Sequence, residues 1–512
     1  MNWLRYTLLL LILTVFVVPT TNGAENRAEP RIEVILWFDT EDYMLPASDD
    51  AAKRVADLLT ERKVKATFKV VGEKARTLEK RSRTDVIAAL KRHDIGYHSN
   101  FHSVHPTPAE YLAECALLDG IEEFVRREGP GAADVRRILG VETLSCYGQP
   151  GSSWGPQTIA GLAQIGVAPG GVTCYVDEGN HVGMKGKPFW YCNALVVYYM
   201  LPNRTRFDLH TPGALETGKA DVTKIADRLR GEGGGLISIF YHPCEWVHQQ
   251  FWDGVNFSRG ANPPREQWKA PPQRTEQETE AAFEKFAAYV DHIRAIPGVR
   301  WVTASDLPAM YADRARTEGA SKGDLLELAK RLTDASSTGI DYQTIEGKTF
   351  SPADQFELLV RAVASAIEGK SDNGPMKITP LLGPDSAPPP SIDEDKRRIP
   401  WPAFRDAVLD VRSYLQTNGR LPARTYRGAD AVPPADFLIP LAAAFQHHAT
   451  HLNWPTDIKL SREVALLPTR HIARDTPTLF GGWVIHKPGF RAPKILEVAR
   501  LQAWTLKPAV RQ

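Results

Sequence analysis

The sequence predicts an α/β fold with a parallel sheet, followed by a smaller helical domain. Short apolar runs typical of buried strands alternate with helical patterns from about residue 33 to residue 310. Polar residues of the kinds used in catalysis directly follow several of these runs. Beyond Arg316 the pattern changes to short helices and Pro-rich turns. Two kinds of domain are therefore expected in this chain.

The apolar runs predict strands, and the amphipathic stretches between them predict helices. The expected strands are 33–39, 66–72, 95–99, 144–149, 195–201, 236–242 and 300–304. The expected helices are 47–64, 108–127, 157–165, 222–230 and 276–296. In α/β folds the chemistry lies at the carboxyl ends of the strands. Asp39, His98 and His242 fall at such ends, and Pro150 does so too.

Composition excludes some classes of partner. The chain has 512 residues, enough for two or three domains. Its 62 Lys and Arg residues offset its 61 Asp and Glu residues, which leaves a net charge of +1. Nothing in this balance indicates a nucleic-acid or anionic-membrane partner.

The N-terminus predicts export. Arg5 precedes the apolar run 8–18, and small or polar residues lead to Ala24. This is the layout of a signal peptide covering 1–24, so we expect a secreted, periplasmic or cell-wall-associated protein. The alternative is an uncleaved anchor, because Asn22 is a poor residue three positions before the cut. The five cysteines are odd in number and lack metal-ligand spacing, and their pairing cannot be read from the sequence.

The C-terminal part contains a faint internal repeat. We divide it into a helical module at 317–368, a Pro-rich linker at 369–400, and a second module with the C-terminal region at 401–512. Pro-Ala-Asp recurs at Pro352 and Pro434, each time between an apolar helical pattern and another one. A chance match remains the alternative for this pair.

Two clusters of polar residues predict a metal site. Asp39, Glu41 and Asp42 lie within four positions at the end of an apolar run, where like charges repel unless a cation, a proton or catalysis is involved. His98 and His102 are four residues apart and close another predicted strand. Two imidazoles and a carboxylate are the ligand set of a catalytic zinc-type site. His105 either holds one of these ligands in place or is only a turn residue.

Five segments together carry a family resemblance. FDTED, ATFKVVG, HSNFH, YGQPG and SIFYHP, in this order, resemble the signature segments of the polysaccharide deacetylase superfamily, carbohydrate esterase family four. The resemblance covers about residues 31–316. It implies a distorted parallel (β/α) barrel, one divalent metal ion, usually Zn²⁺, and removal of N- or O-acetyl groups from glycans.

The resemblance also implies roles for individual residues. Asp39 is the general base, and His242 is the acid that protonates the leaving amine. The implied metal ligands are Glu41, His98 and His102, with Asp42 as the fallback carboxylate. Gln149 and Pro150 of the third segment are implied to bind substrate.

The third segment departs from the family pattern. The family has an Arg two positions before the Pro, where it orients the catalytic Asp, but this chain has Gly148 there. Gln149 or an Arg from elsewhere would have to replace it, or Asp39 is held less well. Glu41 as a ligand in place of Asp also lengthens the reach. These departures leave open an altered substrate or a site that has lost activity.

Aromatic residues after the last segment form a candidate sugar platform. Trp246, Trp252 and Trp268 lie in an insertion at 245–274, and Trp246 is the one we assign to substrate binding. The alternative is that these rings only pin a long loop onto the barrel. The pair His447 and His451 also has ligand spacing, but no acidic residue accompanies it, so we interpret it as helix surface.

The helical repeats are similar to pseudomurein-binding repeats. The best match is YLQTNGRLP at 414–422. This similarity implies a wall-targeting module, so we expect a chain ending near Arg316 to fold and to act on soluble oligomers without binding walls.

Three functions follow from these observations. The first is an exported, metal-dependent deacetylase of a cell-wall or extracellular glycan. The second is a non-catalytic carbohydrate-binding protein on a decayed barrel, and the third is an amidase acting on another C–N bond. Metal content together with acetate release would separate them.

Overall fold

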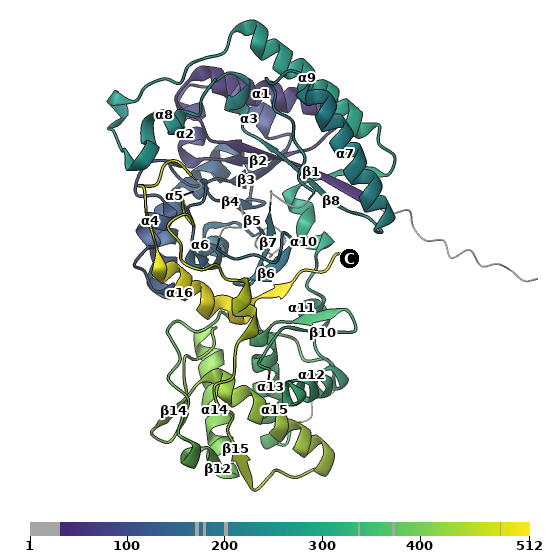
Figure 1. Ribbon diagram of the computed structural model, residues 1–512, viewed down its shortest axis with the longest axis vertical. Coiled ribbons are helices and arrows are strands. Elements are labelled where there is room, and N and C mark those ends of the chain that lie inside the picture. The colour runs from purple at the N-terminus through teal and green to yellow at the C-terminus, as the bar shows by residue number, and fades with distance from the viewer. Residues whose placement is uncertain are drawn as a thin grey trace, which may run out of the picture.

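The chain folds into an α/β unit and a helical unit, which lie one above the other in Figure 1. The computed structural model describes residues 31–168, 174–177, 181–198, 203–335, 338–370, 374–481 and 483–512. The predicted signal peptide lies outside these residues. Among the helices described, none is long and apolar enough to cross a membrane. All five cysteines are free thiols.

A single sheet organises the first unit, and its strand order is β16-β6-β7-β5-β4-β3-β2-β1-β8, with β9 also paired to β1. Its strands are β1 (Ile32–Thr40), β2 (Thr67–Val70), β3 (Asp94–Tyr97), β4 (Tyr147–Gly148), β5 (Cys174–Asp177), β6 (Phe189–Tyr191), β7 (Ala194–Tyr198), β8 (Gly235–Tyr241), β9 (Val299–Val302) and β16 (Lys507–Pro508). All pairs are parallel except those of β6 with β7 and with β16. The predicted α/β class with a parallel sheet is confirmed.

The central strand is β1. All nine of its residues are buried, as expected for a strand covered on both faces. One edge pairs with β8, while the other pairs with β9 at its start and with β2 at its end. Within the described residues the strands pair in an open order. A bridge between Arg204 and Ser238 does bring the chain after β7 against β8.

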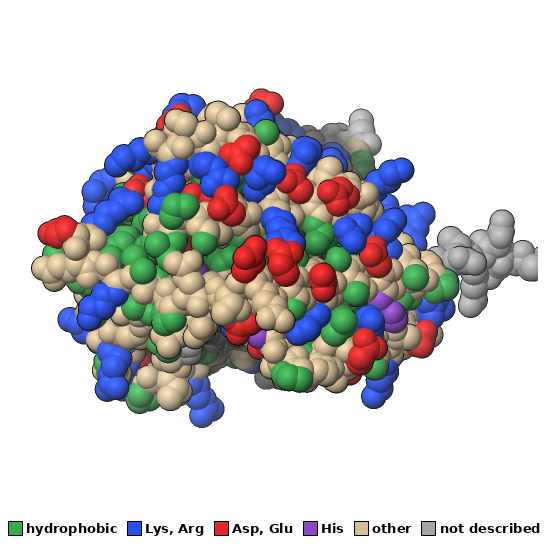
Figure 2. Space-filling model, turned by 90° about the horizontal axis from the view of Figure 1, so that it is seen from above, with side chains coloured by type: hydrophobic (Ala, Val, Ile, Leu, Met, Phe, Trp, Pro, Cys, Tyr) green, Lys and Arg blue, Asp and Glu red, His purple; other side chains and the backbone are tan. Residues whose placement is uncertain are grey.

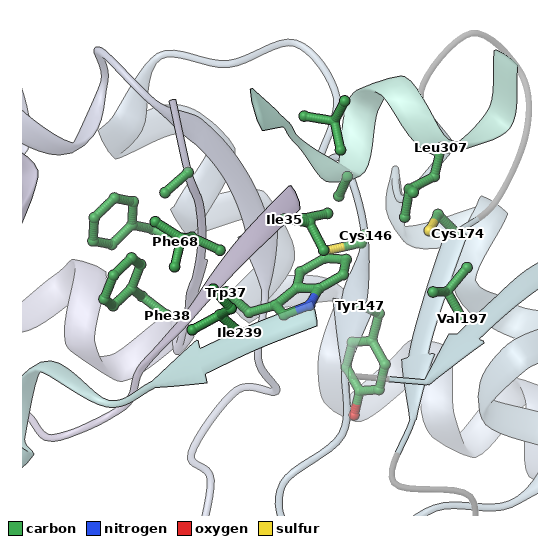
Figure 3. Packing of buried hydrophobic residues seen from close by; sticks show 14 of the residues in the cluster. Ile35, Trp37, Phe38, Phe68, Cys146, Tyr147, Cys174, Val197, Ile239 and Leu307 are labelled. Atoms are coloured by element: carbon green, nitrogen blue, oxygen red, sulfur yellow. The ribbon is translucent and has the colours of Figure 1, made fainter. Parts of the chain in front are cut away.

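Aromatic packing fixes the end of β1. Phe38 stacks on Phe68 of β2 with ring centroids 4.8 Å apart. The Trp37 indole Nε1 donates a 2.9 Å hydrogen bond to Ser238 Oγ on β8. Figure 3 shows both rings among the buried side chains of the core. The residues that follow β1 therefore leave a rigidly held strand.

Helices surround this sheet. They are α1 (Pro46–Glu61), α2 (Gly72–Lys80), α3 (Thr84–Leu90), α4 (Pro108–Leu112), α5 (Leu117–Leu139), α6 (Pro156–Gly161), α7 (Ala214–Gly231), α8 (Trp252–Phe257), α9 (Glu276–Arg294), α10 (Leu307–Met310) and α11 (Arg314–Glu318). All seven predicted strands and all five predicted helical regions contain an observed element. The helix expected at 108–127 is in fact two helices. Strands β5, β6 and β16 were not predicted.

The helical unit contains the internal repeat. Each copy is a helix, a short hairpin and a second helix. The copies are α12 (Lys322–Asp334), β10 (Gln343–Ile345), β11 (Lys348–Phe350) and α13 (Pro352–Ile367), then α14 (Trp401–Asn418), β13 (Thr425–Arg427), β14 (Asp430–Val432) and α15 (Pro434–His451). The two copies share one hydrophobic core, in which the rings of Phe356 and Phe437 lie 6.3 Å apart.

The domain boundaries depart from the predicted division. The two helical copies are one unit rather than two modules. Residues 374–400 of this stretch pack against them, because Met376 pairs with Ala320 and Leu382 pairs with Arg420, and β12 (Arg398–Pro400) pairs with β15 (Asp457–Lys459). Pro-rich composition therefore marks an ordered connection here and not a free linker.

The last residues of the chain return to the α/β unit. Helix α16 (Pro493–Gln502) packs against α6, and β16 extends the sheet beside β6, as the yellow segment in Figure 1 shows. Region 401–512 is therefore divided between the two units. A chain ending near Arg316 would lack this edge strand and this covering helix, so we now expect it to be less stable than the full chain.

Charges of both signs are interspersed on the surface. The face in Figure 2 carries Lys and Arg side chains beside Asp and Glu side chains, without a large field of one sign. This distribution agrees with the net charge of +1.

Lys507 holds the two units together. Its Nζ lies 2.7 Å from Asp354 Oδ2 of α13 and 2.7 Å from Asp313 Oδ2, and it donates to the Thr349 carbonyl at 2.9 Å. The Lys507 side chain and both carboxylates are buried. Removal of this ammonium would leave the buried Asp354 carboxylate without its ion-pair partner, while Asp313 would keep its 3.1 Å contact with Arg316.

We therefore expect Lys507→Met to lower the free energy of unfolding by about 3–5 kcal/mol, the range for breaking a buried ion pair. Urea unfolding followed by circular dichroism measures it. The control is Lys494→Met, which removes a partly exposed pair with Glu497 and should cost about 0–1 kcal/mol. Equal losses in the two variants would contradict this role for Lys507.

Candidate active site and metal centre

One cavity collects the polar residues that follow β1, β3 and β8. Its volume is about 640 Å³. It lies where the carboxyl ends of these parallel strands meet. The lining residues are Asp39, Glu41, His98, His102, Gln149, Gly151, Phe240, His242, Gln250, Phe251, Asp253, Gly254, Trp483 and Val484. Asp39, His98 and His242, three of the four strand-end residues named from the sequence, therefore line one cavity, while Pro150 does not.

Glu41, His98 and His102 form a ligand cluster. One ligand atom of each lies within 4.8 Å of the others, and all three side chains are buried. Glu41 Oε2 is 3.0 Å from His102 Nε2 and 3.5 Å from His98 Nε2. Burial would raise the pKa of Glu41, but the histidines hold it well below its usual value. The carboxylate is therefore ionised where a cation would bind.

Hydrogen bonds orient the two imidazoles toward Glu41. His98 Nδ1 lies 2.8 Å from the Gly148 carbonyl, which can only accept, so Nδ1 donates and Nε2 keeps its lone pair. His102 Nδ1 lies 2.6 Å from Ser103 Oγ, which in turn is 3.4 Å from Asp253 Oδ2. Such supports fix which nitrogen can bind a metal. The converging set fits one divalent cation, and Zn²⁺ suits its nitrogen and oxygen donors.

The loop that carries both histidines is strained and anchored. Ser99 and His102 have φ values of 67° and 56°, which non-glycine residues rarely adopt. Glu128 of α5 holds this loop, since its Oε2 accepts from the Asn100 amide at 2.7 Å and from the Tyr97 hydroxyl at 3.0 Å. Burial raises the pKa of Glu128 to about 7. Strained backbone therefore lies in the turn that carries the imidazoles.

Asp39 lies in the cavity but outside the ligand cluster. Its Oδ1 forms an ion pair with Lys69 Nζ at 2.6 Å, and its Oδ2 is 3.6 Å from His242 Nε2. Burial would raise the pKa of Asp39, but Lys69, His98 and His242 together lower it. An ionised carboxylate beside a metal cluster has the protonation state of a general base.

Glu245 holds the His242 ring in place. Its Nδ1 is 2.7 Å from Glu245 Oε1, and Glu245 Oε2 is 2.6 Å from Arg206. Burial would lower the pKa of His242, but Glu41, Glu245 and Asp39 raise it to about 9. A protonated imidazole whose Nε2 faces the cavity can give a proton to a leaving group.

Two predicted residues lie outside the ligand cluster. Asp42, the fallback ligand, turns away from the cluster, where its Oδ2 lies 3.2 Å from His248 Nδ1 and its Oδ1 accepts from the Met44 amide at 2.8 Å. His105 Nδ1 pairs with Glu110 at 2.7 Å. Asp42 is thus directed toward His248 rather than toward the ligands, and His105 lies in the turn before α4.

The predictions for substrate residues have mixed outcomes. Gln149 lines the cavity, whereas Pro150 is buried and does not. The assignment of Trp246 is wrong, because its ring is fully buried among Tyr241, Phe283 and Phe286. Trp252 is also buried and packs 6.1 Å from His102, which agrees with the alternative that these rings pin the loop.

Four functional residues were missed by sequence reasoning. Lys69 is the cation that pairs with Asp39. Glu245 contacts His242, and its position three residues after His242 is a signal that the sequence offered. Phe251, 39% exposed, forms an aromatic wall beside His242. Trp483 comes from the far end of the chain, and its Nε1 donates to Asp253 Oδ2 at 3.2 Å. No local signal marked Trp483.

The Trp483 segment is fitted closely to the site. Its ring meets the edge of His102 with centroids 5.4 Å apart. A Cβ on Gly151, whose φ is +51°, would lie 2.2 Å from this ring. Glycine is therefore required at residue 151 both for its backbone conformation and for space.

We expect His98→Ala and His102→Ala each to lose stoichiometric metal, because two remaining ligands cannot hold the ion tightly. Metal analysis after dialysis measures this. His105→Ala is the matched control, since His105 pairs with Glu110 and should leave the metal content unchanged. Equimolar metal in either ligand variant would refute the cluster.

Comparisons with known proteins give only distant likenesses. No protein-family model and no curated protein matches this chain. A structure from Mycobacterium smegmatis, assigned as a polysaccharide deacetylase, shares 16% identity over 56% of this chain and 92% of its own, with a TM-score of 0.33. The Puue allantoinase shares 13% identity over 55% of this chain and 92% of its own chain, with a TM-score of 0.35. The peptidoglycan deacetylase Bd3279 of Bdellovibrio bacteriovorus shares 16% identity over 54% of this chain and 53% of its own chain, with a TM-score of 0.27.

Proposed function

We propose that this chain is a metal-dependent hydrolase that removes acetyl groups from a glycan. Because the TM-scores above are low, the proposal is drawn from the chain's own residues. The observation that carries it is the convergence of a metal-ligand cluster, an ionised non-ligand Asp39 and a protonated His242 in one cavity. Binding alone requires no such base and acid.

Glu41, His98 and His102 would hold the ion. A divalent cation there would act as a Lewis acid toward a carbonyl oxygen and lower the pKa of water. The five sequence segments that resemble the polysaccharide deacetylases supply these same residues. The chemistry of the donor set and the resemblance therefore point to one reaction class.

The chain's own residues account for the proton transfers in amide hydrolysis. As water attacks the acetyl carbon, Asp39 accepts the proton that the water loses. As the C–N bond breaks, His242 donates its Nε2 proton to the leaving nitrogen. The products are acetate and a free amino group on the sugar. Glu245 holds the His242 ring in place throughout, through its 2.7 Å contact with Nδ1.

The aromatic walls of the cavity favour a sugar as substrate. Phe251 is partly exposed beside His242, and Trp483 faces the cavity from the C-terminal segment. Apolar CH faces of sugar rings pack on such rings. An acetylated hexosamine of a cell-wall or extracellular polysaccharide is the substrate class we propose.

Asp39→Asn tests the reaction directly. We expect it to keep equimolar metal and to reduce kcat for acetate release by about 10²–10⁴-fold, the usual contribution of a general base. Acetylated chitooligosaccharides and peptidoglycan are the substrates, and Asp395→Asn, on an exposed residue, is the control. An unchanged kcat in Asp39→Asn would remove Asp39 from this role. A metal-loaded parent that binds glycan but releases no acetate would support the non-catalytic alternative.

Export and wall attachment complete the proposal. The signal-peptide pattern at 1–24 supports export, and a mature protein beginning at Glu25 by mass spectrometry would verify the cut. The repeated helix–hairpin–helix unit, with its YLQTNGRLP segment, supports a role in holding the enzyme at the wall. Attachment would raise the local concentration of the enzyme at its substrate.

We expect the full chain to co-sediment with isolated cell walls whether or not the metal cluster is intact. His98→Ala should therefore pellet as the parent does, since the helical unit lies apart from the cavity. Loss of pelleting together with the metal would instead assign wall binding to the active site.

A further inference from the structure

The cation that the third sequence segment lacks is present on another strand. Asp39 and Lys69 are direct partners in the register of β1 and β2. Paired residues of parallel strands point to the same face, so the register alone sets Lys69 beside Asp39. Their side chains meet at 2.6 Å, and Lys69 is 1% exposed. This pair is buried, and Lys69 is the cation that contacts Asp39 Oδ1.

Space for the Lys69 side chain comes from two glycines on neighbouring strands. A Cβ on Gly148 of β4 would lie 2.6 Å from Lys69 Nζ and 2.7 Å from its Cδ. A Cβ on Gly96 of β3 would lie 3.1 Å from Lys69 Cγ. Any side chain at residue 148 would therefore displace the ammonium from Asp39. The Gly148 carbonyl also accepts from His98 Nδ1, so the backbone there remains in use.

We propose that Lys69 is the positioning residue of Asp39, and that Gly148 and Lys69 together replace the arginine that the third segment lacks. In this chain the positive charge beside Asp39 comes from β2, and the glycine on β4 leaves room for it. This inference rests on the proposed function for its role in turnover. It assigns to Lys69 the role that the sequence left open to Gln149 or another Arg.

The two carboxylate oxygens of Asp39 have different partners. Lys69 contacts Oδ1, while Oδ2 faces His242 Nε2 at 3.6 Å. Oδ2 is therefore the oxygen left to accept a proton, and Lys69 fixes which oxygen that is. A lysine acts as a point charge, unlike the planar fork of an arginine, and one oxygen is all it needs to hold.

An exchange of charge between the two positions tests the proposal. We expect Lys69→Met to keep equimolar metal and KM within about twofold while kcat falls about 100-fold or more, because a mispositioned base affects the reaction step. Gly148→Arg should also lose activity, since its side chain collides with Lys69. The double variant Lys69→Met/Gly148→Arg should recover at least about tenfold over either single variant, as coupled positions do. Lys65→Met, at an exposed lysine just before β2, is the control.

A second measurement needs no substrate. Lys69→Met should lower the thermal unfolding temperature, because Asp39 is left as a buried carboxylate without its cation, and adding Asp39→Asn should restore part of the loss. This cycle reports on the pair even if the parent releases no acetate from any glycan tried. It also supplies a folded variant if Lys69→Met alone does not fold.

Three results would overturn the proposal. One is a Lys69→Met enzyme whose kcat stays within about twofold of the parent, a change too small for a positioning residue of the base. Another is a double variant no better than the single ones. The third is additive effects of Lys69→Met and Asp39→Asn on stability. If the parent is inactive but the stability effects are coupled, the proposed function fails while the pairing stands.

Discussion

Two carboxylates buried at the end of one strand govern the arrangement of this site. Asp39 lies near the end of β1 and Glu41 directly follows this strand, whose residues are all buried. Burial alone would favour the neutral forms of both carboxyl groups. Lysine and histidine side chains approach these carboxylates from three other strands. Lys69 reaches Asp39 from β2, the imidazoles after β3 face Glu41, and His242 approaches both from β8. The strand order β3-β2-β1-β8 is what brings these charges together.

The partners of each charged group also explain why the acidic residues of the site differ in their properties. Glu41 belongs to a cluster whose imidazole lone pairs converge, so it is suited to a cation. Asp39 has its counter-charge from Lys69 and is left outside the cluster. His242 receives its proton because carboxylates surround it. Neighbouring acids in one cavity can thus have different roles, since each has a different partner.

The C-terminal segment joins the two units and completes the site. Lys507 compensates Asp313 and Asp354, one from each unit, and β16 closes the edge of the sheet. Trp483 on the same segment reaches Asp253, which supports His102 through Ser103. The two copies of the helical repeat differ in the partners of their equivalent Asp residues. Asp354 pairs with Lys507, whereas its counterpart Asp436 accepts from Ser391 and from the Val464 amide.

The sequence by itself indicated most strands of the large sheet, most helices of the α/β unit and the central candidate site residues. Apolar runs mark buried strands, and the polar residues directly after them must lie at one edge of a parallel sheet. Asp39, Glu41, His98, His102 and His242 could therefore be named in advance. The helical repeat was visible for a similar reason, because each copy keeps its own local pattern of helix, turn and helix.

Only the tertiary structure decided how distant segments meet. Lys69 looked like a lone charge in an apolar strand until the register set it opposite Asp39 and the glycine at residue 148 left it room. Trp246 looked like a sugar platform, yet packing buried it, while Trp483 was supplied by a segment more than two hundred residues further along the chain. Local patterns record which residues are buried or polar. Which side chain compensates a buried charge depends on strand order and packing, and these are properties of the whole fold.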